Sequence, residues 1–210
     1  MNKYIFIQAR MSSSRLPGKV LLPFGDSTVL QTIYEKCRCI SGVKNVVILT
    51  STETDDDEIQ ELCSINDMQI FRGSLNNVLG RFQDAARAIC KAQDFIVRIC
   101  ADSPLISASL LQDFIDDLDC DDVVLSTRCV SNKGIISTTG KGNNLDAIIT
   151  SELLNIIAHD ESIREHIIYG FDYSKGFRLF KPNFELESEL KLNLNQCIDT
   201  EEDYARLTEC

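Results

Sequence analysis

Three basic side chains lie close together near the start of the chain, at Arg10, Arg15 and Lys19, and no acidic residue precedes Asp26. Exposed cations on one short loop repel one another unless solvent or an anion neutralises them. The loop 8–19 also contains serines and a glycine, whose small side chains let backbone N–H groups form a nest for phosphate oxygens. Arginine adds a planar fork of donors, and lysine adds a mobile point charge. The pattern predicts a polyphosphate site, with a solvated basic turn as the alternative.

Two better-known phosphate loops do not fit this segment. A Walker loop that ends in Gly18-Lys19 needs glycine at position 13 and serine or threonine at position 20, but the chain has Ser13 and Val20. The Gly-x-Gly-x-x-Gly pattern of dinucleotide-binding folds is absent from the loop. The predicted phosphate site is therefore of another type.

One aspartate, Asp102, is suited to hold a metal ion beside such a phosphate. Asp102 directly follows the apolar run 95–100, and Mg²⁺ in phosphate sites takes one or two carboxylates plus phosphate oxygens. The alternative for Asp102 is a turn cap before the Ser-Pro pair that follows it. Near the C-terminus, a helix cap made by Thr200 and Asp203 would explain those two residues but leaves Asp199 unexplained.

Apolar patterns predict the elements that position these residues. Runs of four to six residues rich in β-branched and aromatic side chains predict strands, and apolar residues at helical spacing predict helices. The predicted strands are 4–7, 45–50, 68–71, 95–100, 121–126, 177–181 and 190–194, and the predicted helices are 29–39, 76–92 and 110–118. Alternating strands and helices indicate βαβ units, an α/β fold and a mainly parallel sheet. Ligands bind beyond the carboxyl ends of such strands, so the loop 8–19 and Asp102 should share one edge of the sheet.

Two segments are harder to interpret. The acidic cluster 55–58 is typical of a helix start, and a metal site is the less favoured alternative. Residues 128–144 show no clear periodicity and contain several glycines and asparagines. A stretch of that length without regular structure predicts a flexible, functional loop.

Length and composition restrict the protein class. The 210 residues predict a single domain, 1–210, and the net charge of −11 argues against a nucleic-acid partner and an anionic membrane. There is no run of 18 apolar residues and no signal-peptide pattern, so a cytoplasmic location is expected. Nine cysteines without a C-x-x-C pair, and only two histidines, predict reduced thiols and no zinc site.

The basic loop resembles the signature loop of the cytidylyltransferases of surface-sugar biosynthesis, in the segments Gln8-Ala9-Arg10-Met11 and Arg15-Leu16-Pro17-Gly18-Lys19-Val20-Leu21. This family includes the acylneuraminate and 3-deoxy-manno-octulosonate enzymes, and the branch of the spore coat polysaccharide biosynthesis protein F is most similar. Later segments match in the same order, including the Asp-x-Pro-Leu-Ile element at 102–106 and the closing motif at 197–204. The chain departs from the family at Ser12, where glycine is usual, and at Asn77, where an acid is common.

This resemblance implies a Rossmann-like three-layer α/β/α fold of the nucleotide-diphospho-sugar transferase (GT-A-like) type. It also implies that Arg10, Arg15 and Lys19 act in catalysis and that Asp102 and Asp199 bind Mg²⁺. The nucleotide contacts that it implies are Gln8, Ala9, Arg10, Ser12, Ser13, Arg15, Lys19, Arg72, Ser74 and Arg81. For Ser74, a plain helix N-cap is the alternative.

The family uses the region comparable to 128–170 for the acceptor and for dimer contacts, so a homodimer is expected from the resemblance. Asp146 lies in an element similar to the branch's Gly-Leu-Asp, and Arg164 and His166 lie in an Arg-Glu-His segment. These three residues are the predicted acceptor contacts. A lone histidine is more often structural than catalytic, and that reading stays open for His166.

The predicted activity is Mg²⁺-dependent transfer of CMP from CTP to a sugar, expected to be acidic, with release of pyrophosphate. The basic loop would neutralise the leaving pyrophosphate, and the two aspartates would hold the metal against the α-phosphate and the attacking oxygen. Transfer to a phosphonate or phosphorylated alcohol, and nucleotide binding without turnover, are the alternatives. The sequence names neither the acceptor nor a general base, and the preference for cytosine rests on the resemblance alone.

Overall fold

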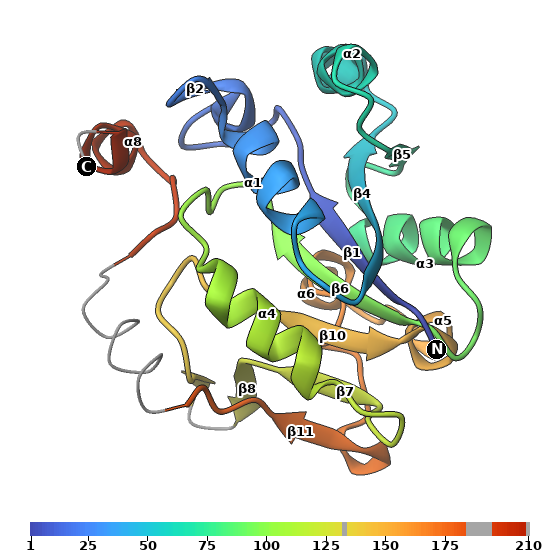
Figure 1. Ribbon diagram of the computed structural model, residues 1–210. Helices are drawn as coiled ribbons and strands as arrows, with labels where there is room; N and C mark the ends of the chain where they lie inside the picture. The colour runs from blue at the N-terminus through green and yellow to red at the C-terminus, as the bar shows by residue number, and fades with distance from the viewer. Residues whose placement is uncertain (132–133, 184–194, 209–210) are drawn as a thin grey trace.

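A seven-stranded sheet with the strand order β11-β7-β10-β6-β1-β4-β5 forms the centre of the computed structural model, which describes residues 1–131, 134–183 and 195–208 (Figure 1). Only β10 among the described strands of this sheet runs against its neighbours, and the remaining pairs are parallel. The strands are β1 (Lys3–Gln8), β4 (Val43–Ser51), β5 (Ile70–Gly73), β6 (Phe95–Cys100), β7 (Val124–Ser126), β10 (Asp146–Ile149) and β11 (Phe177–Leu179). The predicted α/β fold with a mainly parallel sheet is confirmed.

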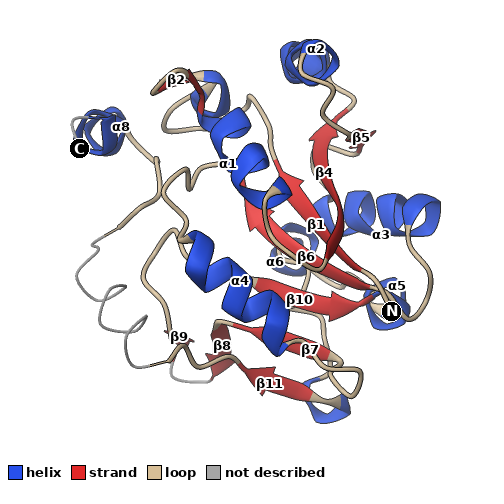
Figure 2. Cartoon of the chain, viewed as in Figure 1, coloured by secondary structure: helices blue, strands red, loops and turns tan. Residues whose placement is uncertain are grey.

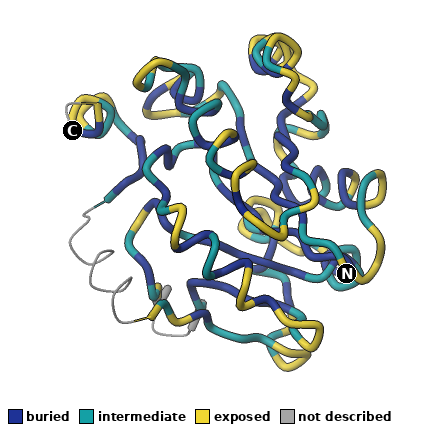
Figure 3. The backbone as a smooth tube through the Cα atoms, viewed as in Figure 1, coloured by how far each residue is buried: buried dark blue, intermediate teal, exposed yellow. Residues whose placement is uncertain are grey.

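Helices cover both faces of the sheet, which gives three layers (Figures 1 and 2). In β1, Ile5 and Ile7 belong to one apolar core, whereas Tyr4 and Phe6 belong to the other, because successive side chains of a strand point to opposite faces. The helices that contribute to the first core are α1 (Val29–Arg38), α2 (Asp57–Ile65), α4 (Ala108–Asp117) and α8 (Glu201–Thr208), and those of the second are α3 (Val78–Ile89), α5 (Thr150–Asn155) and α6 (Glu161–Glu165). Figure 3 shows the central strands buried between these layers.

Side-chain caps set where several helices begin. The Thr28 hydroxyl accepts a hydrogen bond from the backbone N–H of Gln31 (3.2 Å) at the start of α1. At the start of α3 the cap is Asn77, whose side-chain oxygen accepts from the N–H of Gly80 (3.0 Å). The suggested N-cap at Ser74 was wrong, because the Ser74 hydroxyl accepts instead from the N–H of Asn77. Asn77, the departure from the family pattern, therefore has a clear local role.

The segment 128–144 differs from the prediction of an irregular loop. It contains a hairpin of β8 (Arg128–Ser131) and β9 (Gly134–Ser137), and β10 then enters the main sheet in the antiparallel direction. These strands are only four residues each, too short to give a recognisable period. The predicted strand 121–126 is shorter than expected and begins at Val124, and the predicted strand 190–194 lies outside the described residues.

The acidic cluster 55–58 begins a helix, as predicted, through the 3₁₀ turn η2 (Thr54–Asp56) and α2. The carboxylate of Asp56 accepts hydrogen bonds from the backbone of Met11 and Ser51 and from the Thr50 hydroxyl. Although burial works to raise the pKa of Asp56, these hydrogen bonds outweigh it and lower the pKa below its ordinary value. Asp56 thus anchors the basic loop to the sheet.

Seven of the described cysteines are free thiols, namely Cys37, Cys39, Cys63, Cys90, Cys100, Cys120 and Cys197. None of the described helices has the length and apolar character needed to cross a bilayer.

Candidate active site

The site lies at the carboxyl ends of β1 and β6, where Gln8 and Cys100 are register partners. In the sheet, β4 lies on one side of β1 and β6 lies on the other, so the strand order reverses between β1 and β6. Such a point leaves a crevice for ligands in open α/β sheets. The basic loop follows β1 and Asp102 follows β6, so the prediction that they share one edge is confirmed.

The basic loop is folded back by its own backbone. The N–H groups of Ser13 and Gly18 both donate to the carbonyl oxygen of Met11, at 2.8 and 2.9 Å. Gly18 has φ +71°, a left-handed conformation that glycine adopts without strain, and it precedes the 3₁₀ turn η1 (Lys19–Leu21). The turn begins at Lys19, whose side chain extends into the site.

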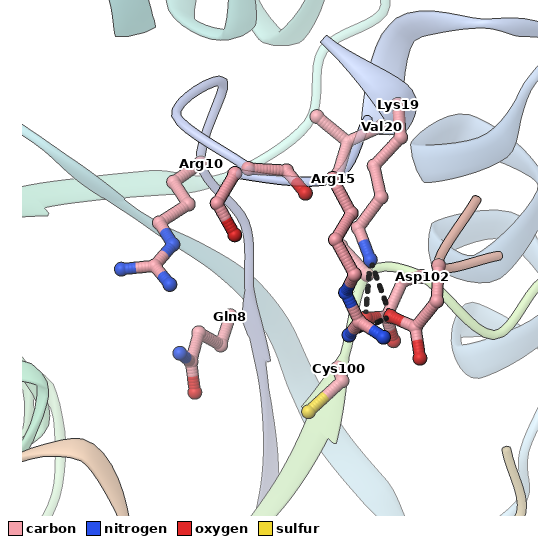
Figure 4. Close-up of a pocket in the computed structure, with 11 residues that line it drawn as sticks. Gln8, Arg10, Arg15, Lys19, Val20, Cys100 and Asp102 are labelled. Carbon is pink, nitrogen blue, oxygen red and sulfur yellow. Dashed lines mark hydrogen bonds and ion pairs between the residues drawn. The ribbon is translucent and has the colours of Figure 1, made fainter. Parts of the chain in front are cut away.

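Lys19 joins the two aspartates that the sequence places far apart. Its Nζ donates to Asp102 Oδ2 at 2.8 Å (Figure 4). It also donates to Asp199 Oδ1 at 3.2 Å and to the carbonyl oxygen of Ile198 at 2.6 Å. All three donors of the ammonium are therefore used, and Lys19 is only 8% exposed. The predicted convergence of Lys19, Asp102 and Asp199 is confirmed.

Asp199 also contacts two further cations. Arg15 Nη2 lies 2.9 Å from Asp199 Oδ1, and Lys141 Nζ lies 2.7 Å from Asp199 Oδ2. Burial works to raise the pKa of Asp199, but the hydrogen bond from Lys141 and the charge of Lys19 outweigh it and hold the pKa below its ordinary value. Sequence reasoning missed Lys141; its one available signal was a cation between two glycines in the segment 140–142.

The C-terminal segment 195–199 is hydrogen-bonded to the edge of the sheet and to the loop 140–144, which carries Lys141. The N–H of Ile198 donates to the carbonyl oxygen of Asp102 (2.7 Å), and the N–H of Gln196 donates to that of Lys141 (2.8 Å). Gly142 has φ +97°, and a Cβ there would lie 2.7 Å from the backbone of Gln196. The loop can therefore pack this closely only because position 142 is glycine.

Two adjoining cavities share Cys100, Asp102 and Asp199. The first, of about 200 Å³, is lined by the predicted residues Gln8, Arg10, Ser13, Arg15, Lys19, Asp102 and Asp199, together with Ser14, Val20, Cys100 and Ala101. In Figure 4, Gln8 and Arg10 lie across this cavity from Lys19 and Asp102. The second cavity, of about 180 Å³, adds Lys141 and Asn144. Arg10, Arg15 and Lys19 line the first cavity, and the carboxylates of Asp102 and Asp199 border both cavities.

Other predicted nucleotide contacts lie outside these two cavities. Ala9 is buried, and Ser12 lines a separate cavity of about 140 Å³ beside Asp56. Arg72 is held by the carbonyl oxygens of residues 51 and 53, by Gln60 and by Asp57. Arg72 therefore fastens the turn before α2, and its predicted nucleotide contact stays a prediction.

Ser74 and Arg81 also bond to their own segment. Arg81 is fully buried, its Nη1 donates to the carbonyl oxygen of Ser74 (2.9 Å), and burial lowers the pKa of Arg81 to about 10. Their predicted contacts with the nucleotide are also untested.

Asp146, expected to contact the acceptor, is instead the centre of a buried ion-pair cluster. It is 0% exposed and accepts hydrogen bonds from Ser126 (2.7 Å), Arg128 Nε (3.1 Å) and Arg98 Nη1 (3.3 Å). Burial opposes the charged form, but the two arginines outweigh it and lower the pKa of Asp146. Asp146 is the first residue of the antiparallel β10, which lies between β6 and β7, and its predicted contact with the acceptor stays a prediction.

The cluster around Asp146 touches the site through Gln8, since Arg98 Nε donates to Gln8 Oε1 at 3.2 Å. Of the other predicted acceptor contacts, Arg164 is exposed on α6, and His166 packs its ring on Tyr169 with centroids 4.2 Å apart. Neither residue lines the two cavities.

His166 is expected to make stability depend on pH. Burial, together with the charges of Arg98 and Arg128, lowers the pKa of His166 from 6.5 to about 4. As pH falls below about 6.5, His166 is protonated in the unfolded chain before it is protonated in the folded protein. The free energy of unfolding therefore decreases until pH reaches about 4. Urea unfolding at a series of pH values should show a smaller loss over that range for His166→Phe than for the wild type. Equal losses would contradict this role.

Comparisons with known proteins agree with this geometry. Residues 4–168 match the sequence family described as cytidylyltransferase. The fold superposes on the structure of a cytidylyltransferase from Leptospira borgpetersenii with a TM-score of 0.85 and 33% identity, covering 100% of this chain and 86% of that one.

Two relatives with named roles match over part of their length. The spore coat polysaccharide biosynthesis protein SpsF of Bacillus subtilis is 37% identical over 53% of this chain and 48% of its own. The 3-deoxy-manno-octulosonate cytidylyltransferase of Acinetobacter baumannii is 32% identical over 60% of this chain and 50% of its own. The match thus spans about half the length of these relatives.

Proposed function

The chain belongs to the cytidylyltransferase family, and from this premise we propose that it transfers CMP from CTP to a small sugar acceptor and releases pyrophosphate. The observation that carries the proposal is the contact of Lys19 with both Asp102 and Asp199 at the carboxyl edge of the sheet. Cations and carboxylates converging on one cavity suit a polyphosphate with a divalent metal ion.

The cations of the first cavity would bind the β- and γ-phosphates and neutralise the charge that develops on the leaving pyrophosphate. Arg15 offers a planar fork, Lys19 a point charge, and Arg10 a second fork from the other side of the cavity. Holding the α-phosphate in line with the acceptor oxygen would supply much of the rate enhancement. The positions of these side chains around the first cavity support this division of roles.

The two carboxylates fit the demands of Mg²⁺, which takes hard oxygen ligands and keeps places for phosphate oxygens and water. Asp102 and Asp199 would hold the ion, and their oxygens point to the same place, because both contact one Lys19 ammonium. When bound, Mg²⁺ supplies Lewis-acid polarisation of the α-phosphate and lowers the pKa of the attacking hydroxyl. No protein general base is required by this scheme.

The second cavity is the proposed place of the acceptor, since it adjoins the carboxylates on the side away from the basic loop. A sugar, expected to be acidic, is supported by the roles that the names of the two relatives give them. A phosphonate or phosphorylated alcohol is the alternative acceptor. A homodimer with contacts in 128–170 and a cytoplasmic location are further proposals, from the resemblance and from the composition respectively.

A thermal-shift series with CTP, UTP, ATP and GTP, each with and without Mg²⁺, tests the nucleotide and metal together. CTP with Mg²⁺ should raise the melting temperature most. An assay of pyrophosphate release with acidic sugars, neutral sugars and phosphorylated alcohols then identifies the acceptor. Stabilisation by CTP without pyrophosphate from any acceptor would overturn the enzyme assignment in favour of a nucleotide-binding protein.

A further inference from the structure

Every carboxylate oxygen of Asp102 and Asp199 accepts a hydrogen bond or ion pair from a neighbouring side chain. Asp102 Oδ2 accepts from Lys19 and Oδ1 from the Ser103 hydroxyl at 3.3 Å. Asp199 Oδ1 faces both Lys19 and Arg15, and its Oδ2 faces Lys141. A metal ion cannot bind these oxygens unless at least one of these donors moves.

The charge of this cluster also opposes a metal ion. Three cations contact the two carboxylates, which leaves an excess of one positive charge. The ammonium of Lys19 is the hardest to displace, because its side chain is only 11% exposed and all its donors are bonded. A buried cation leaves its partners only if another anion or water replaces them. A divalent ion alone supplies no such anion.

A triphosphate supplies the missing anion. The first cavity lies beside Lys19 and Arg15, so phosphate oxygens there can replace the carboxylates as partners of both cations. Arg15 and Lys141 are 61% and 53% exposed at their side chains, so they can swing away at little cost. Lys19 can reach the phosphate oxygens by rotation about the bonds of its flexible side chain.

We infer that the Lys19 ammonium occupies the position of the metal ion in the ligand-free protein, so that metal and nucleoside triphosphate bind as a coupled pair. The triphosphate draws Lys19 and Arg15 to its own oxygens and so frees the carboxylates for the metal. By linkage, the metal raises the affinity for the triphosphate by the same factor. This inference rests on the proposed function for the identity of the nucleotide, but not for the exclusion of the metal by Lys19.

Binding of Mn²⁺, followed by the loss of the free-ion EPR signal, tests the exclusion without any nucleotide. Lys19→Met should bind Mn²⁺ at least about tenfold more tightly than the wild type, within the usual range of such couplings. Lys141→Met removes an exposed ammonium and leaves the contacts of the buried Lys19 intact. It should raise the affinity for Mn²⁺ by about two- to fivefold, because the charge of Lys141 is screened by solvent. Lys175→Met is the matched control, because Lys175 pairs with Glu152 on the surface, at 3.1 Å, and should leave Mn²⁺ binding unchanged.

The same titration with CTP present and no acceptor, corrected by a protein-free control for the Mn²⁺ that CTP itself chelates, tests the coupling. The wild type should bind Mn²⁺ about tenfold or more tightly with CTP than without it, and Lys19→Met should lose most of that difference. Equal Mn²⁺ affinity of the wild type in its free and CTP-bound forms, or no gain in either lysine variant, would overturn the inference. If CTP fails to bind while Lys19→Met still tightens Mn²⁺ binding, Lys19 is supported as the residue in the metal position and the nucleotide assignment is the part that fails.

Discussion

Turnover with CTP is expected to fall about 100- to 1,000-fold in Lys19→Ala, since removing one preorganised group that stabilises transition-state charge has an effect of this size. Asp102→Asn should cause a comparable loss, because a neutral amide is a poor ligand for a hard cation. The two residues contact each other, because Lys19 Nζ lies 2.8 Å from Asp102 Oδ2. The measurement is pyrophosphate release at saturating CTP, metal and the identified acceptor.

Both variants should keep the fold. In Lys19→Ala, the Asp199 carboxylate retains Arg15 and Lys141 as partners, so no buried charge is left alone there. Circular dichroism and the melting temperature would verify this, with Lys175→Ala as the surface control. Near-normal turnover in either folded variant would remove that residue from the proposed mechanism.

Asp146→Asn is expected to destabilise the protein by about 3–5 kcal/mol, the usual cost of removing one partner of a buried ion pair. The change keeps the size of the side chain but leaves Arg98 and Arg128, which are 7% and 9% exposed, without their counter-charge. The free energy of unfolding from urea denaturation measures the effect at neutral pH.

Asp84→Asn is the matched control for this prediction. Asp84 pairs with Arg87 at 2.8 Å on the surface of α3, and exposed pairs contribute about 0.2–1 kcal/mol. Similar losses in Asp146→Asn and Asp84→Asn would show that the buried cluster has no special role in stability. Because Arg98 also bonds Gln8 at the cavity, the Asp146 variant should in addition weaken turnover more than its stability alone accounts for.

Local patterns were sufficient for much of this protein. The apolar runs at β1, β4 and β6 are long enough to show their period, and parallel strands place their carboxyl ends at one edge, so the basic loop and Asp102 could be brought together from the sequence. A helix cap accounted for Thr200 and Asp203 but left Asp199 unexplained, and the family resemblance then proposed Asp199 as a metal ligand. The structure has this cap, with the N–H of Asp203 bonded to Thr200 Oγ1 at 3.2 Å.

Tertiary structure alone decided the partners of the charged side chains. Lys141 reaches Asp199 because the loop 140–144 packs on the C-terminal segment, and Asp146 is buried because β10 enters the sheet in the antiparallel direction. Both depend on contacts between residues far apart in sequence, and short strands and single charges carry no periodic signal of such contacts. The residue types and their spacing thus indicated the chemistry, whereas packing determined which charged side chains line the cavities and which are buried beside the sheet.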